Sequence, residues 1–244
     1  MNKIYVVGLG PGAGDQMTVQ AKKVLDACPV IIGYTVYIDL VRPLFPEKQF
    51  LSTPMRKEAD RCKMAFEEVK KGVDVAMVCS GDSGIYGMAS LVDELAEQDY
   101  PEIGIEIVPG ITAASGGAAV LGAPLMHDFA VISLSDLLTP WELIEKRLCA
   151  AAEADFVICL YNPSSRKRAD YLEKACEIIL KSRSEETVCG LVKNIGREGE
   201  LYEIMTLKKL KTTQADMFTT VYIGNSNTKE LNGKMVTPRG YKDV

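Results

Sequence analysis

Histidine and tryptophan are almost absent from this chain, since each occurs once among 244 residues. The single histidine, His127, excludes a metal site built from several imidazole ligands, and it leaves a serine nucleophile only one usual base. Basic residues are not in excess either, because 28 Lys and Arg stand against 33 Asp and Glu, giving a formal net charge of −5. Nucleic-acid-binding surfaces need clustered positive charge, so we expect no nucleic-acid partner.

Paired cysteines and long apolar segments are also missing. The seven cysteines form no Cys-x-x-Cys pair, and several lie in apolar runs such as residues 156–161, FVICLY. This pattern is typical of reduced, buried thiols and gives no cluster of metal ligands. No run of about 18 apolar residues occurs, and no signal-peptide core follows the first residues. We therefore expect a cytoplasmic protein without a protein-bound metal and without a membrane partner.

What the sequence does contain is an alternation of short apolar runs and amphipathic segments, which predicts an α/β protein. The apolar runs predict strands at residues 4–8, 30–32, 73–80, 105–108, 129–134, 156–161, 187–192, 200–207 and 217–224. Helical spacing and capping signals predict helices at residues 18–28, 56–71, 86–97, 111–122, 141–152 and 166–181.

The character of these strands predicts two α/β domains. Continuous apolar strands in the first part predict a mostly parallel N-terminal sheet, and the mixed polar and apolar strands near the end predict a mixed C-terminal sheet. A segment of small residues that contains Pro124 separates the two series. We predict an N-terminal domain at residues 1–115, a linker at 116–127 and a C-terminal domain at 128–244.

The stretch SGDSGIYG, residues 80–87, contains the letters that surround the nucleophile of chymotrypsin-like proteases. A protease is not expected, because the one histidine follows Ser83 by 44 residues in an α/β chain and no Gly-x-Ser-x-Gly elbow occurs. The stretch instead joins a predicted strand to a predicted helix, where backbone N–H groups can meet a ligand and glycines allow close approach. A plain structural turn is the alternative.

A second glycine-rich stretch, GLGPGAGD at residues 8–15, follows the first predicted strand and formally matches a dinucleotide fingerprint. Pro11 removes a backbone donor, and the predicted helix starts only near Thr18. The next strand is followed by no acidic residue for a ribose hydroxyl. These departures argue against a nicotinamide cofactor.

Two further strand ends carry turn-forming residues, VPGITAAS at 108–115 and LYNPSSRKR at 160–168. Ligands of open α/β sheets bind outside the carboxyl ends of the strands, so all four stretches are candidates for one site. Three basic residues at the start of a predicted helix, 166–168, oppose the helix dipole, which suggests that they meet an anion. An ordinary solvated basic face is the alternative.

Four motifs together resemble those of the tetrapyrrole methylase family, in order and in spacing, over essentially the whole chain. They are GLGPG at 8–12, GDSGIYG at 81–87, PGITAAS at 109–115 and YNP at 161–163. Three other segments resemble the C17-methyltransferases of cobalamin (vitamin B12) biosynthesis within that family, namely TPMRKE at 53–58, HDFAVISLSDLLTPW at 127–141 and VTPRGY at 236–241.

The resemblance implies an S-adenosylmethionine-dependent C-methyltransferase that acts on C17 of precorrin-3B or cobalt-factor III with ring contraction and releases S-adenosyl-L-homocysteine. It also implies a homodimer of two-domain subunits with the active site in the cleft between the domains. Other readings stay open: a family member that methylates another ring carbon, a non-catalytic tetrapyrrole-binding or carrier protein, and a nucleotide-dependent oxidoreductase.

Site residues follow from the resemblance, position by position. The implied cofactor-binding residues are Pro11, Gly81, Asp82, Ser83, Tyr86, Thr112, Ala113, Tyr161, Asn162, Leu191, Val192 and Asn194. Many relatives carry proline at the position of Ser83 and methionine at that of Asn162. The loop that contains Gly10 and Gly12 is implied to face the substrate.

The substrate and the proton transfers of ring contraction suggest the remaining candidates. A tetrapyrrole rich in carboxylates needs local positive charge, which arginine supplies best. The candidates for this contact are Arg56, Lys57, Arg166, Arg168 and Arg239. His127 is a candidate acid or base because its ordinary pKa lies near neutrality, and Asp82 is a second one. A histidine that serves only packing between domains is the alternative.

Overall fold

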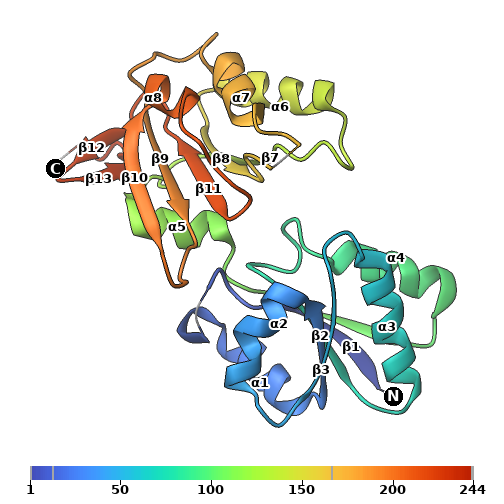
Figure 1. Cartoon of the computed structure of the whole chain (residues 1–244). Coiled ribbons are helices and arrows are strands. Elements are labelled where there is room, and N and C mark those ends of the chain that lie inside the picture. Colours follow the sequence, from blue (N-terminus) through green and yellow to red (C-terminus); the bar gives the residue numbers. More distant parts are fainter. Residues whose placement is uncertain (1, 13, 166, 243–244) are drawn as a thin grey trace. The chain divides into compact units, whose positions relative to one another are not determined.

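The computed structural model describes residues 2–12, 14–165 and 167–242 (Figure 1). The chain divides into two compact units, Met1–Ala113 and Ala114–Val244. The predicted α/β class is confirmed, with a parallel five-stranded sheet in the first unit and a mixed five-stranded sheet in the second. Part of the predicted linker, residues 116–121, lies in helix α5 (Ala113–Leu121).

The sheet of the first unit has the strand order β3-β2-β4-β1-β5, and all its neighbouring strands are parallel. Its strands are β1 (Lys3–Gly8), β2 (Val30–Tyr34), β3 (Gln49–Thr53), β4 (Val75–Cys79) and β5 (Gly104–Val108). The central strand β4 is buried along its whole length, as its uninterrupted apolar sequence predicts. The edge strand β3 is not among the predicted strands, because QFLST contains only two apolar residues.

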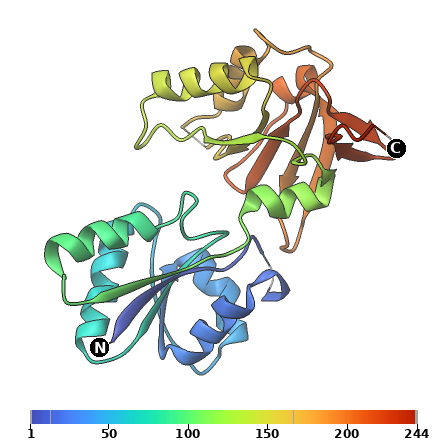
Figure 2. The same ribbon diagram turned by 180° about the vertical axis from the view of Figure 1, so that it is seen from behind.

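Helices cover both faces of this sheet (Figures 1 and 2). They are α1 (Val19–Ala27), α2 (Thr35–Val41), α3 (Glu58–Lys70) and α4 (Ala89–Asp99), with short 3-10 helices η1 (Gly14–Gln16) and η2 (Arg42–Leu44). Side chains alternate along β1, so Val6 packs in the core beneath α3 and α4 and Val7 packs in the core beneath α1 and α2. The connections after the adjacent strands β1 and β4 therefore leave toward opposite faces, which is the switch point where such sheets bind ligands.

The two helices that follow these strands begin differently from one another. Helix α1 begins as predicted, because the Thr18 hydroxyl accepts a hydrogen bond from the Ala21 N–H at 3.0 Å as an N-cap. Helix α4 begins at Ala89 rather than at Tyr86, so the prediction is wrong by three residues. The loop between β4 and α4, residues 80–88, is therefore longer than the sequence suggests.

The main sheet of the second unit has the strand order β10-β9-β11-β8-β7. Its strands are β7 (Phe129–Ser133), β8 (Val157–Tyr161), β9 (Val188–Lys193), β10 (Leu201–Thr206) and β11 (Thr219–Ile223). Strands β7 and β8 are parallel, and β11 runs antiparallel to both β8 and β9. The carboxyl ends of β7, β8 and β9 consequently lie at one edge. A small sheet completes the unit with β6 (Gly122–Ala123), β12 (Lys229–Leu231) and β13 (Lys234–Val236).

Helices also cover both faces of the second main sheet. Helices α6 (Trp141–Glu153), α7 (Tyr171–Ile179) and α8 (Leu207–Lys211) share one apolar core with it. Helix α5 packs on the opposite face (Figure 2). There its Gly117 meets Tyr222 of β11, and its Leu121 meets Gly190 of β9. Helix α7 begins at Tyr171 rather than at residue 166, which corrects the prediction. In the described ranges, no helix combines the length and apolar character needed to cross a bilayer.

Candidate functional site

The carboxyl tips of β1, β4 and β5 are joined by backbone contacts into one cluster in the first unit. Beyond the strands, the Leu9 N–H donates to the Cys79 carbonyl at 2.9 Å. Gly10 and Gly81 then exchange two hydrogen bonds, of 3.0 and 2.8 Å, as an antiparallel bridge. The predicted loops at residues 8–15 and 80–87 therefore lie side by side, at the switch point of the sheet.

Three glycines allow these tips to touch. A Cβ atom on Gly110 would overlap the carbonyl oxygen of Gly81, and one on Gly8 would lie 2.6 Å from the Gly110 nitrogen. Gly81 also has a φ of +70°, which disfavours any side chain. A larger residue at Gly8 or Gly110 would separate the tips, whereas one at Gly81 would strain the backbone. The glycine pattern of the sequence therefore follows from close backbone approach and from one left-handed position.

Asp82 ties two of the tips together through its carboxylate. Oδ1 accepts hydrogen bonds from the N–H groups of Gly84 and Ile85 at 2.8 and 3.1 Å, which closes a turn within its own loop. Oδ2 accepts a hydrogen bond from the Gly110 N–H at 2.9 Å, in the loop after β5. These three bonds make Asp82 a brace between loops, and they occupy N–H groups that the sequence analysis assigned to a ligand.

Ser83 is fully buried behind this brace, with 0% of its surface exposed. Its hydroxyl donates a hydrogen bond to the Val108 carbonyl at 3.1 Å, and its own carbonyl accepts one from the Ala89 N–H at the start of α4. This placement gives Ser83 a structural role and no access to a substrate. Tyr86, by contrast, has 56% of its surface exposed, and its backbone has a positive φ of +54°.

The other candidates of the first unit flank the same tips. The place where a Gly81 Cβ would stand is 3.7 Å from the Ala113 nitrogen and 3.8 Å from the Thr112 Cα, so both residues adjoin this loop. Pro11 is buried and Gly12 is half-buried in the loop after β1. Gln16, which the sequence analysis did not single out, has a buried Oε1 without a hydrogen-bond partner among the described residues.

The carboxyl edge of the second sheet gathers a second group of candidates. Tyr161 ends β8, and its hydroxyl accepts a hydrogen bond from the Ala114 N–H in α5 at 2.8 Å. Asn162 follows with a φ of +53°, and its Nδ2 donates to the Ser133 hydroxyl at the end of β7 at 3.0 Å. Asn194, after β9, also has a positive φ, of +52°. Left-handed backbone explains why asparagine suits positions 162 and 194.

Leu191 and Val192 lie within β9 rather than at its end. Both are paired with β10 on one side and with β11 on the other, so the ladders surround their backbone. Val192 is fully buried, and the half-buried Leu191 packs against the core beneath α6 and α7. Neither offers the kind of turn that Tyr161 and Asn194 provide.

The basic candidates differ in their exposure and in whether they pair with an acidic residue. Arg56 is exposed, with a φ of +65°. Lys57 pairs with Asp60 at 2.9 Å, and the hydrogen bond that Lys57 donates to this carboxylate raises the pKa of Lys57. Arg168 is half-buried beside Asp136, with 3.7 Å between Nη1 and Oδ1, and its Nε donates to the Ser165 hydroxyl at 3.1 Å. Arg166 lies outside the described residues.

Arg239 reaches the backbone beside His127 in the second unit, although the two residues are far apart in the sequence. Arg239 Nη1 donates to the carbonyl of Met126, the residue before His127, at 3.5 Å. The imidazole is half-exposed, and its Nδ1 accepts a hydrogen bond from the Asp128 N–H at 3.0 Å. Both side chains are at the surface, so a charged group can reach the pair.

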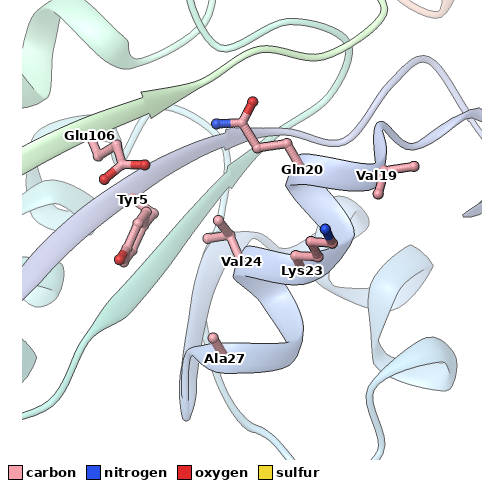
Figure 3. Close-up of a pocket in the computed structure, with 7 residues that line it drawn as sticks. All are labelled: Tyr5, Val19, Gln20, Lys23, Val24, Ala27 and Glu106. Atoms are coloured by element: carbon pink, nitrogen blue, oxygen red, sulfur yellow. The ribbon is translucent and has the colours of Figure 1, made fainter.

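The described residues contain no group of three or more His, Cys, Asp or Glu side chains that could hold a metal ion. A cavity of about 450 Å³ does exist in the first unit, between α1 and the strands β1 and β5 (Figure 3). Its lining consists of Tyr5, Val19, Gln20, Lys23, Val24, Ala27 and Glu106. None of these belongs to the predicted site, so the cavity and the strand tips are separate features.

Sequence reasoning missed several residues that hold the site together. Gly8 and Gly110 lie within the motifs GLGPG and PGITAAS. The regular placement of glycines at the ends of predicted strands was the signal that could have identified them. Ser133 and Tyr222 contact site residues from other strands. No local pattern marks such residues, because their partners are distant in sequence.

Comparisons with known proteins agree with this arrangement. Residues 3–211 match the family model of the tetrapyrrole (corrin/porphyrin) methylases. The chain is 46% identical to a probable cobalt-factor III C(17)-methyltransferase of Salmonella typhimurium, over 98% of this chain and 99% of that protein. It is 39% identical to a precorrin-3B C(17)-methyltransferase of a Sinorhizobium species, over 98% and 96%. A crystal structure of the methyltransferase CobJ matches with a TM-score of 0.90 and 34% identity, over 98% of this chain and 100% of that one.

Proposed function

We propose, because this chain belongs to the tetrapyrrole (corrin/porphyrin) methylase family, that it is an S-adenosylmethionine-dependent C17-methyltransferase of cobalamin biosynthesis. Its substrate is cobalt-factor III or precorrin-3B, and the reaction contracts the macrocycle. The observation that carries the proposal is full-length similarity to relatives with these names, at 46% and 39% identity. The higher identity to the first supports the cobalt-containing substrate.

The strand tips of the first unit fit the cofactor. Gly10, Gly81 and Gly110 present main chain without side chains, and the Thr112–Ala113 backbone adjoins them. In this proposal Gly81, Tyr86, Thr112 and Ala113 hold the cofactor from the first unit, and Asp82 and Ser83 fix the shape of the loop. Tyr161, Asn162 and Asn194 are assigned to the cofactor from the resemblance of their motifs to the family. The bound cofactor supplies a methyl group on a sulfonium, which a ring carbon accepts without a protein nucleophile.

The residues of the chain therefore act mainly by orientation. Methyl transfer needs the accepting carbon and the methyl group aligned at about 3–3.5 Å, and rigid loops supply such alignment. The hydrogen bonds of Asp82 and the glycine contacts make the tips rigid without using a side chain for chemistry. The burial of Ser83 supports this reading, since no exposed nucleophile is needed.

Substrate recognition is assigned to exposed basic residues and to the loop after β1. Arg239 and Arg56 are both exposed and can pair with carboxylates of the macrocycle, with Gly10 to Gly12 facing it. His127 is the proposed acid or base of ring contraction, since it is accessible and Arg239 contacts the carbonyl of the residue before it. Its conversion to alanine should preserve methyl transfer and lower the yield of contracted product, which mass and absorption spectra of the product would separate.

We also propose that the protein is a cytoplasmic homodimer. The free state of all seven cysteines supports a reducing compartment. Exposed apolar residues on the edge strand β10, Leu201 and Tyr202, support an interface between copies. Light scattering after gel filtration would give the mass in solution, and a monomer at micromolar concentration would contradict the dimer.

The direct test is calorimetric titration with S-adenosyl-L-homocysteine, followed by turnover with each candidate macrocycle. We expect binding of the homocysteine product and no binding of NAD. Incubation with labelled S-adenosylmethionine should place the label on C17, as NMR of the product would show. Cofactor binding without methyl transfer to either macrocycle would favour a carrier protein, and a methyl group on another carbon would favour another activity of the family.

A further inference from the structure

The hydroxyl group of Tyr222 is inserted against the first turns of helix α5. Tyr222 lies in β11 and has 0% of its surface exposed. Its hydroxyl donates a hydrogen bond to the Ala114 carbonyl at 2.9 Å. The backbone N–H of Ala118 donates to the same oxygen, while burial raises the pKa of Tyr222 far above its ordinary range. The hydroxyl thus contacts both members of a pair that an α-helix joins directly.

The sequence of α5 is adapted to this contact. A Cβ atom on Gly117 would overlap the Tyr222 hydroxyl and would lie 2.8 Å from the Ile195 Cδ1, so only glycine admits the tyrosine at this depth. The Ala114 N–H is held as well, because it donates to the Tyr161 hydroxyl at 2.8 Å. Two tyrosines from neighbouring strands therefore fix both backbone polar groups of Ala114.

We propose that Tyr222 is a positioning residue for cofactor binding. This inference rests on the proposed function, in which Thr112 and Ala113 contact the cofactor. Ala113 is the first residue of α5, and Ala114 comes directly after it. Since Tyr222 fixes Ala114 from a rigid central strand, it sets the path of the chain through Ala113 and Thr112. Without the hydroxyl, the start of α5 loses this hold on the Ala114 carbonyl and is free to shift relative to β11.

The test compares Tyr222→Phe with wild type by titration with S-adenosyl-L-homocysteine, after circular dichroism has shown that both are folded. We expect a Kd raised by about tenfold, corresponding to about 1.4 kcal/mol. The KM for S-adenosylmethionine should rise in parallel, with kcat nearly unchanged, because the variant loses positioning rather than chemistry. A purely structural role would lower the melting temperature and leave the Kd alone.

Thr237→Val provides the matched control. It removes another buried hydroxyl of the second unit, one whose hydrogen bond of 2.8 Å goes to the Thr228 hydroxyl and not to α5. We expect it to lower the melting temperature and to keep the wild-type Kd. Equal Kd values for Tyr222→Phe and wild type would overturn the inference alone, whereas wild type that does not bind the homocysteine product would overturn the proposed function as well.

A second variant tests the contact from the side of the helix. Gly117→Ala pushes a methyl group against the Tyr222 hydroxyl, so it should also weaken binding of the homocysteine product. Combined with Tyr222→Phe, the methyl group no longer meets the hydroxyl and keeps only its contacts with Ile195 and the ring, so the double variant should lose less binding than the sum of the two single losses. Additive losses in the double variant would mean that the two residues act separately, and they would contradict the proposal.

Discussion

At the scale of single residues, the close approach of the tips of β1, β4 and β5 depends on glycines, because a side chain there would overlap neighbouring backbone. We predict that Gly110→Ala lowers the free energy of unfolding by about 3 kcal/mol and abolishes cofactor binding, because the new Cβ would overlap the Gly81 carbonyl and force the loops apart. Urea denaturation and titration with the homocysteine product measure both effects. Gly104→Ala is the control, since its Cβ would meet only the Lys3 Cβ, at 3.6 Å. Equal stability of the two variants would contradict the close packing of these tips.

Asp82 allows a sharper test at the same scale, because bracing and catalysis predict different kinetics. In Asp82→Asn the amide oxygen can accept from Gly84 and Ile85 or from Gly110, and the NH₂ group then faces the remaining N–H, so at least one of three hydrogen bonds is lost. We expect a loss of about 1–3 kcal/mol in stability and weaker cofactor binding. The saturated rate of methyl transfer should change little.

Asp15→Asn, an exposed aspartate in the neighbouring loop, should behave like wild type in these assays. The opposite pattern for Asp82→Asn, with binding intact and the rate collapsed, would assign Asp82 to proton transfer instead. The sequence could place Asp82 at a strand end, since a buried apolar strand precedes it. The direction of its carboxylate was not predictable, because one partner, Gly110, is 28 residues away.

At the scale of elements, apolar patterning predicted most of the strands and misjudged how some helices begin. Strands such as β4 and β8 were predictable because nearly every residue in them is buried. Helices α4 and α7 begin several residues later than expected, because loop residues are held by local hydrogen bonds, such as those of Asp82 and of Ser165 with Arg168. Short elements such as α2, with 7 residues, and β12, with 3 residues, span too little of the chain to show a period.

The loop after β7, residues 134–140, is an element whose rigidity can be measured. Its tip exposes Leu137 by 61% and Leu138 by 97%, while its base is held by the Tyr171 hydroxyl, which donates to Asp136 Oδ2 at 2.6 Å. Tyr171→Phe removes this charge-assisted bond, which is worth about 1.5–3 kcal/mol. We predict that thermolysin, which cleaves before leucine, cuts this loop about tenfold faster in the variant.

Tyr202→Phe serves as the control for that experiment, because Tyr202 is exposed on the edge strand β10. Peptide mapping should place the new cleavage before Leu137 or Leu138. Unchanged digestion rates, or cleavage elsewhere in Tyr171→Phe, would mean that the loop is held by other contacts.

At the scale of the whole molecule, the pKa values of the cysteine thiols depend on their burial in the folded state of both units. Burial raises the pKa of Cys28, Cys62 and Cys176 to about 12 and that of Cys79 to about 11, and it raises the pKa values of Cys159 and Cys189 as well. Cys149 is the one cysteine that is only half-buried. The apolar runs around several cysteines predicted this burial, whereas the sequence could not rank their accessibilities, which depend on helix packing.

These raised pKa values predict that stability falls in alkaline solution. Above pH 9 the unfolded chain releases thiol protons that the folded chain still binds, so each buried thiol lowers the free energy of unfolding by up to about 1.4 kcal/mol per pH unit. Below that pH both states keep the proton, and the contribution is constant. Urea denaturation between pH 7 and pH 10 should show this slope. Because lysines and tyrosines also titrate there, the decisive comparison is between a variant and wild type: Cys176→Ala should reduce the slope by up to one proton. Equal slopes in Cys176→Ala and wild type would mean that the Cys176 thiol is ionised as readily in the folded core as in the unfolded chain.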